Sequence, residues 1–120
     1  DYWNVLGNRW VRAEECDFVT RLMFMQQMHK TYAGTSTVCT GVASKLPGTI
    51  VYEMARQECQ ERLATFFGHP GGVIETEAKV ELDGNTWRAA RATVARTARR
   101  IMEGYVFVPS WAEHLEIAAE

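Results

Sequence analysis

Apolar and polar residues alternate most clearly over residues 72–82, in the segment GVIETEAKVEL. A period of two residues is typical of a strand that buries one face. The face expected to be buried carries Ile74, Thr76, Ala78, Val80 and Leu82, and the opposite face carries Glu75, Glu77, Lys79 and Glu81. Asp83-Gly84-Asn85 then predicts a hairpin turn into a second strand, TWRAARATV, over residues 86–94.

Two more segments have a strand-like pattern. TIVYEMA, residues 49–55, alternates Ile50, Tyr52 and Met54 with Val51 and Glu53. GYVFV, residues 104–108, is rich in aromatic and β-branched side chains, which favour strands. We therefore predict strands over both segments. A short C-terminal helix, WAEHLEIAAE, is expected after Pro109-Ser110.

Helical spacing dominates the first part of the chain. In residues 13–29, AEECDFVTRLMFMQQMH, the apolar stripe consists of Phe18, Leu22, Met25 and His29, with Val19 beside it. This spacing predicts one helix, and Glu14 and Glu15 suit its first turn. A second helix is predicted over Thr37–Leu46, ended by Pro47-Gly48. Two helices followed by an antiparallel meander predict an α+β fold, with residues 1–120 as a single domain.

Composition narrows the class of protein. The chain has 120 residues, with 47% apolar and 23% charged residues and a net charge of −2. These values are ordinary for a soluble globular domain and do not favour a nucleic-acid partner. No apolar run approaches the roughly 18 residues of a membrane span, and no leader pattern opens the chain. We expect no membrane partner, and a reducing cytoplasm is the simplest location.

The cysteines indicate neither a disulfide framework nor a metal site. Cys16, Cys39 and Cys59 are odd in number and have no close-spaced pair. Cys39 falls one turn inside the second predicted helix, where burial would leave its thiol inert. No Ser-His-Asp or paired-carboxylate pattern is present either. No metal or cofactor is expected.

The segment TYAGTSTVCTGVASKLPGT, residues 31–49, is the first candidate site. Gly34, Thr35, Ser36 and Thr37 lead directly into the second helix. Hydroxyl groups and the first backbone N–H groups of a helix suit a carboxylate or phosphate. Plain capping of the helix explains the same residues, because Ser and Thr are preferred caps. The residues alone favour capping.

The segment FFGHPGG, residues 66–72, is the second candidate. Gly68 and its neighbouring glycines allow close approach of the backbone to a ligand, and His69 is a donor for a carboxylate. A tight corner between strands explains the segment equally well.

Two further candidates are basic residues. His29 ends the first predicted helix, where a His more often binds the last carbonyls than a ligand. The cluster RTARR, residues 96–100, carries Arg96, Arg99 and Arg100 and would neutralise a multiply charged acid. A solvated turn is the alternative.

Three segments together resemble a known family. RLMFMQQMHKTYAGTSTVCTGVASKLPGTIV, GHPGGVI and RTARRIMEGYVFVP occur in one order, and from about Tyr2 to Pro109 the chain resembles the C-terminal portion of the PrpF family. This family lies within the diaminopimelate-epimerase-like superfamily. The resemblance implies isomerisation of small unsaturated di- and tricarboxylic acids, such as aconitate, methylitaconate and oxalomesaconate. It also implies two similar halves, each a curled antiparallel sheet around a central helix, with the substrate between them.

The resemblance assigns this chain a binding role and no catalytic residue. It places the proton-moving lysine and cysteine in the first half, and nothing here matches them. In the related epimerases a cysteine precedes Gly-Thr-Gly at a helix start, whereas this chain has Ala33 before Gly34-Thr35-Ser36. Cys39 is too far along the helix to replace it. The implied substrate-binding set is Gly34, Thr35, Ser36, Thr37, Gly68, His69, His29, Arg96 and Arg99.

Two classes of function remain open. The chain is either the substrate-holding portion of a PrpF-like isomerase separated from its catalytic half, or a stand-alone module that binds or oligomerises. A start at Asp1 rather than Met favours a preceding segment. Because a half without its companion exposes apolar surface, we expect either the missing half or a second copy as partner, in a homodimer or higher oligomer.

Overall fold

The structure is a computed structural model, and it describes residues 1–109. Its main sheet has four strands in the order β3-β6-β7-β8. These are β3 (Phe18–Val19), β6 (Ala64–His69), β7 (Gly72–Asp83) and β8 (Thr86–Val94). The predicted antiparallel pairing is confirmed for β7 and β8. Strand β6, which the sequence analysis marked only as a corner between strands, pairs antiparallel with β7, and β3 runs parallel to β6. The fold is α+β with a mixed sheet.

The β7–β8 hairpin follows the alternation in the sequence. Thr76 and Ala78 are buried, whereas Glu75 and Lys79 on the other face are exposed. Asp83 pairs with Thr86 across a two-residue turn, in which Gly84 takes a φ of +61° that glycine adopts without strain. A bulge between Lys79 and Val80 shifts the register in the middle of the hairpin. The predicted strands and turn are confirmed.

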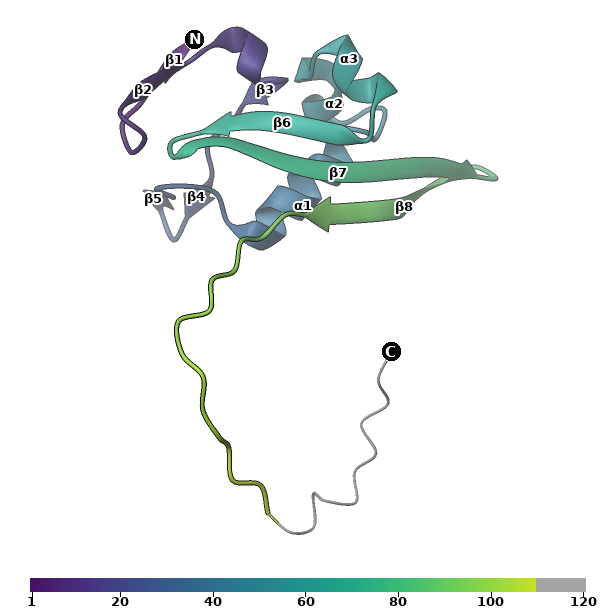
Figure 1. The fold of residues 1–120 in the computed structure, drawn as a ribbon. Coiled ribbons are helices and arrows are strands. Elements are labelled where there is room, and N and C mark those ends of the chain that lie inside the picture. The colour runs from purple at the N-terminus through teal and green to yellow at the C-terminus, as the bar shows by residue number, and fades with distance from the viewer. Residues whose placement is uncertain (110–120) are drawn as a thin grey trace.

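Helix α1 (Gly34–Ala43) covers the buried face of β7 and also contacts β8 (Figure 1). It is the second predicted helix, but it begins three residues earlier and ends before Leu46. A Cβ added to Gly41 would lie 2.6 Å from Cγ2 of Thr76, so this glycine sets how closely the helix approaches the sheet. Ser44, at the end of α1, contacts the Thr65 hydroxyl of β6 at 3.0 Å.

The long helix predicted over residues 13–29 is wrong. The segment instead forms a 3-10 turn, η1 (Ala13–Glu15), strand β3, and a small hairpin of β4 (Met23–Phe24) and β5 (Gln27–Met28). Met25 and Gln26 have φ values of +48° and +63°, which an α-helix does not contain. The backbone of Asp17 pairs with Phe66 of β6. Pairing with the sheet therefore overrides the helical spacing.

The strands predicted over residues 49–55 and 104–108 are also wrong. Residues Ile50–Met54 form helix α2, because the Thr49 hydroxyl accepts a hydrogen bond from the backbone N–H of Tyr52 and caps the helix. Helix α3 (Gln57–Glu61) follows. Residues 95–109 run away from the sheet as an extended segment with no strand partner among the described residues (Figure 1). The helix predicted over residues 111–120 lies outside the described residues.

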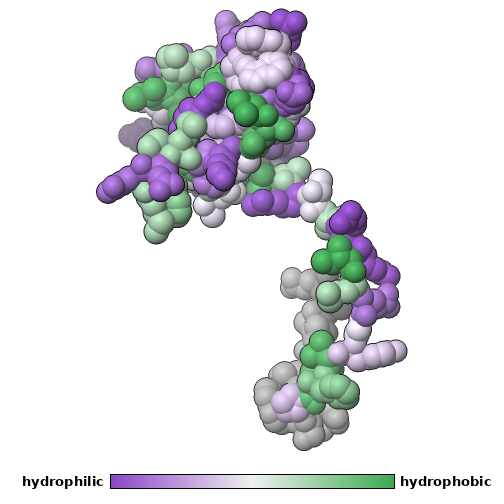
Figure 2. All heavy atoms as spheres, turned by 90° about the vertical axis from the view of Figure 1, so that its left-hand side faces the viewer, coloured by the Kyte–Doolittle hydropathy of each residue, from purple (hydrophilic) through white to green (hydrophobic). Residues whose placement is uncertain are grey.

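A separate hairpin, β1 (Tyr2–Asn4) and β2 (Arg9–Val11), precedes the sheet. The rings of Trp3 and Trp10 meet edge to face across it, with centroids 5.7 Å apart. Figure 2 views the side on which this hairpin and the β4–β5 hairpin lie, and hydrophobic side chains are visible on its surface. Residues 1–109 include no helix that is both long and apolar enough to cross a membrane.

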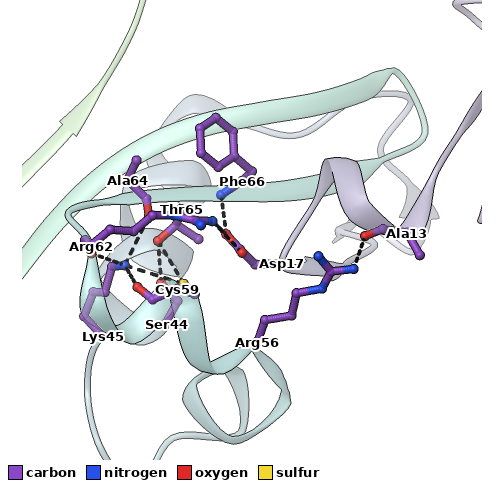
Figure 3. A network of polar contacts seen from close by, with 10 residues as sticks. All are labelled: Ala13, Asp17, Ser44, Lys45, Arg56, Cys59, Arg62, Ala64, Thr65 and Phe66. Atoms are coloured by element: carbon purple, nitrogen blue, oxygen red, sulfur yellow. Dashed lines mark hydrogen bonds and ion pairs between the residues drawn. The ribbon is translucent and has the colours of Figure 1, made fainter.

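A buried polar network joins α1, α3, β3 and β6 (Figure 3). The Asp17 carboxylate accepts hydrogen bonds from Arg62 at 2.6 and 2.7 Å and from the backbone N–H of Phe66 at 2.8 Å. The Lys45 ammonium donates to the backbone carbonyls of Cys59, Arg62 and Ala64. These contacts attach the short elements to the main sheet.

Candidate functional site

The start of α1 presents unpaired backbone donors. Ala33, with φ −68° and ψ 141°, is the residue before the helix, and no side chain caps it. Among the described residues, none accepts a hydrogen bond from the N–H groups of Gly34, Thr35 or Ser36. Capping by the Thr and Ser hydroxyls, the interpretation that the residues alone favoured, is therefore wrong. The first N–H groups of the helix remain available to an anion.

Thr37 has a different role from its neighbours. It is 1% exposed, and its hydroxyl donates to the Ala33 carbonyl at 3.0 Å, beside the backbone bond from Thr37 N–H to the same oxygen. The hydroxyl proton is thus used inside the helix. At this site the N–H groups of Gly34–Ser36, rather than the Thr37 hydroxyl, are suited to donate to a ligand.

Arg96 lies directly against the start of α1. A Cβ on Gly34 would meet the Arg96 guanidinium, the mobile end of a long side chain, so a larger residue here would displace Arg96 from its present position. Together Gly34 and Arg96 border a cavity of about 280 Å³ that Tyr32, Val94 and Ala95 also line, with Glu75 as the one acidic residue among the described residues of the lining. A helix N-terminus carries partial positive charge and repels a cation. An anion between the N–H groups and the guanidinium would relieve this repulsion.

His69 is held in the turn between β6 and β7. It is 6% exposed, and its Nδ1 accepts a hydrogen bond from Gly71 N–H at 3.0 Å. Burial, together with the nearby charges of Arg21 and His29, lowers the pKa of His69 below its ordinary value. His69 is therefore a neutral hydrogen-bond donor near pH 7.

His29 does not cap a helix, because the predicted helix does not exist. Its backbone N–H donates to Leu22 at 2.8 Å, and its Nδ1 accepts from Thr31 N–H at 3.1 Å. Thr31 Cγ2 and His69 Cε1 lie 2.9 and 3.0 Å from the position of a Cβ on Gly71. The structure thus brings residues 29–31 beside the glycine-rich turn.

Most of the expected site residues form two groups, which are joined by a short stretch of chain. Gly34–Thr37 and Arg96 make one, and His69 with His29 makes the other. Thr31 and Gly34 are three positions apart in the chain, so their Cα atoms are at most about 11 Å apart. No hydrogen bond within residues 1–109 joins the two groups. Their convergence on one ligand stays a prediction.

The remaining basic candidates lie on the extended segment. Arg99 is exposed, and no ion pair within the described residues includes it. Arg100 pairs with Glu103 at 3.0 Å, with both side chains about 80% exposed. The alternative of a solvated charge run describes these two arginines, while Arg96 alone of the cluster reaches the helix.

Two other findings concern residues whose surroundings the sequence analysis predicted wrongly or missed. Cys39 is exposed on α1, whereas Cys16 and Cys59 are buried. Tyr2 contacts the His69 turn, although 67 residues separate them, and no local signal in the sequence indicates this. Within residues 1–109 no cluster of three or more His, Cys, Asp or Glu side chains is suited to hold a metal ion.

Comparison with known proteins decides the family. The family model described as PrpF protein matches residues 1–109. This chain belongs to the PrpF family. A curated relative of this PrpF-family chain, 3-methylitaconate isomerase of Eubacterium barkeri, is 48% identical over 108 residues, covering 90% of this chain and 27% of the relative. The 2-methyl-aconitate isomerase of Cupriavidus necator is 36% identical over 91% of this chain and 27% of the relative.

A solved structure agrees with the family assignment. The crystal structure of methylitaconate-delta-isomerase superposes with a TM-score of 0.72 and 42% sequence identity, over 100% of this chain and 30% of that chain. The PrpF-family chain therefore spans about a quarter of the length of the curated relatives it matches.

Proposed function

We propose that this chain is the substrate-holding portion of a PrpF-family isomerase that acts on small unsaturated di- or tricarboxylic acids. The observation that carries the proposal is the start of α1, where Gly34 and Arg96 border one cavity and the N–H groups of Gly34–Ser36 have no acceptor among residues 1–109. A carboxylate suits this pair of donors in charge and size. The named relatives, which act on methylitaconate and 2-methyl-aconitate, support the class of acid.

The proposed reaction is a 1,3-allylic proton shift. A base removes a proton from the carbon next to the double bond, the double bond moves by one position, and a proton is returned at the far carbon. Negative charge develops on the adjacent carboxylate in between. N–H donors and Arg96 aimed at that carboxylate would stabilise the charge as it forms. Gly34–Ser36 and Arg96 would bind and orient the acid, while the residues that move the proton would come from outside this chain.

The finer architecture is part of the same proposal. We expect the chain to form most of one diaminopimelate-epimerase-like half, with α1 as the central helix and the sheet curled around it. The packing of α1 on β7 and β8 and the superposition on an isomerase of the family support this. Either the remaining half of such a protein or a second copy would then be the partner.

Ser36→Asp tests the binding site. The variant places a fixed negative charge at the third helical position, so cis-aconitate binding measured by calorimetry should fall by at least about tenfold. The melting temperature should hold or rise slightly, because an acidic residue suits the first turn of a helix. Gln57→Asp is the matched control, since it adds the same charge to the first turn of α3 and should leave binding unchanged.

Two outcomes would contradict the proposal. Either wild type does not bind cis-aconitate, or Ser36→Asp binds it as tightly as wild type. In a parallel assay the isolated chain should not isomerise aconitate or methylitaconate, followed by the absorbance of the conjugated acid. Turnover by this chain alone would show that it does more than hold the substrate.

The alternative function is a non-catalytic module that associates through its apolar surface. The specific observation in its favour is the run of exposed apolar side chains on residues 101–108, including Tyr105 and Phe107 at 99% and 98% exposure. This alternative predicts association without any affinity for small carboxylates, so the calorimetry above also separates the two functions.

A further inference from the structure

Tyr2 spans the turn that carries His69. Its hydroxyl lies 2.9 Å from the His69 carbonyl oxygen and 2.5 Å from the Gly72 carbonyl oxygen, the two carbonyls on either side of Pro70-Gly71. Its ring packs on Gly68, where a Cβ would lie 2.8 Å from the ring. One hydroxyl proton is therefore shared between two carbonyls, and Tyr2 closes the turn from β1.

The Tyr2 hydroxyl keeps its proton near neutral pH and is therefore a hydrogen-bond donor. Burial and the neighbouring Cys16 raise the pKa of Tyr2 above its ordinary value, despite Arg21 nearby. The Arg21 guanidinium lies over the Tyr2 ring at 5.2 Å from its centroid. Asn4, also on β1 and 2% exposed, approaches Gly72 from the same side. The β1 strand thus forms one wall of the turn.

The His69–Gly72 turn also determines which His69 nitrogen carries the proton. Gly71 N–H can only donate, so the Nδ1 that accepts from it is unprotonated, and a neutral His69 carries its proton on Nε2. No residue within 1–109 accepts a hydrogen bond from Nε2. Since no fully buried side-chain nitrogen or oxygen of these residues lacks a partner, Nε2 reaches the surface.

We propose that Tyr2 is a positioning residue: its hydroxyl holds the His69–Gly72 turn so that Gly71 N–H occupies Nδ1 and the Nε2–H of His69 is presented to a carboxylate oxygen of the ligand. The choice of a carboxylate rests on the proposed function. The two charged or titratable groups that act on His69, Arg21 and His29, both oppose a second proton on the ring. These two groups thus favour a neutral His69 ring that donates from Nε2–H.

Tyr2→Phe removes only the bridge. The variant keeps the ring on Gly68 and beneath Arg21, so it should remain folded. In ¹⁵N-resolved NMR without ligand, wild-type His69 should show the Nε2–H tautomer and a protected Gly71 amide. In Tyr2→Phe we expect a mixture of tautomers, a His69 pKa closer to its ordinary value, and Gly71 hydrogen exchange at least about tenfold faster. Tyr52→Phe, which removes a hydroxyl on α2, should change none of these signals.

Measuring cis-aconitate binding by wild type and Tyr2→Phe separates this proposal from the proposed function. If wild type binds cis-aconitate, Tyr2→Phe should weaken binding by about tenfold, the scale of one lost charge-assisted hydrogen bond. An unchanged tautomer in Tyr2→Phe overturns the positioning role, whatever the ligand result. Unchanged affinity overturns the role of Nε2–H as a carboxylate donor. If wild type binds no cis-aconitate, the proposed function fails and the carboxylate step with it, whereas the tautomer result still decides what Tyr2 does to His69.

Discussion

At the scale of single residues, the buried polar groups do most to join distant parts of this chain. Lys45 is 7% exposed, yet its ammonium contacts no carboxylate of residues 1–109. It donates instead to carbonyls of the segment from α3 to β6, at 2.7 Å to Arg62 and 3.2 Å to Ala64, and also to Cys59 (Figure 3). Carbonyl dipoles thus replace the water that a buried ammonium loses. In the sequence, Lys45 is one more charged residue near the end of a helix.

Lys45→Met should destabilise the protein by about 3 kcal/mol, because one buried and two part-buried carbonyls lose their donor while the aliphatic volume is kept. Urea denaturation of wild type and variant measures this loss. Lys79→Met is the matched control: Lys79 pairs with Glu81 on the exposed face of β7, and such surface pairs contribute under about 1 kcal/mol. Equal effects of the two substitutions would show that the Lys45 contacts contribute little.

At the scale of elements, the close approach of α1 to β7 decides where the candidate site lies. Gly41 faces Thr76, and Ser44 contacts Thr65 one strand further on. This packing orients the helix so that its first turn, at Gly34, faces Arg96 just beyond the end of β8. The position of the unpaired N–H groups therefore depends on a contact two turns away along the helix.

Gly41→Ala should lower stability by about 1–3 kcal/mol, since the new methyl group would lie 2.6 Å from Cγ2 and 2.9 Å from Oγ1 of Thr76 and would force the helix outward. Alanine has the higher helix propensity, so propensity alone predicts the opposite sign. Thermal unfolding distinguishes the two. Gly104→Ala, on the extended segment with open space around it, should leave the melting temperature unchanged.

At the scale of the whole molecule, the described residues leave much apolar surface uncovered. Strand β8 is the last strand of the sheet, and its side chains from Thr86 to Thr93 are exposed. Residues 101–108 carry a further apolar run, with Val106 at 86% and Phe107 at 98% exposure (Figure 2). An unpaired sheet edge and an exposed apolar segment both favour association.

We therefore expect the isolated chain to form a homodimer or a higher oligomer. Light scattering at micromolar concentration should give a mass above that of one chain, and the mass should rise with concentration. Replacing Val106 and Phe107 together by Ser should reduce association, whereas Val5→Ser, in the β1–β2 turn, should not. A monomeric mass at all concentrations would contradict the expectation.

Local sequence determined the parts of this protein whose interactions are local. The β7–β8 hairpin and its turn follow from strict alternation and from Asp83-Gly84-Asn85, and α1 follows from a helix-forming run before Pro47. The glycine-rich corner at 68–72 was recognised for the same reason. Each of these signals lies within about a dozen residues, the range over which hydrophobic periodicity is informative.

Only the tertiary structure decided the rest, because the deciding contacts are distant in sequence. Asp17 is held by Arg62 and Phe66, 45 and 49 residues away, and these bonds turn a helically spaced segment into strand β3. The N–H groups at Gly34 are unpaired because Ala33, which has no capping side chain, is the residue before the helix. Arg96 lies beside them because the chain returns to the start of α1 after β8. Tyr2 reaches the His69 turn across 67 residues. Periodicity reports which face of an element is apolar, but which partner covers that face is decided by packing of the whole chain.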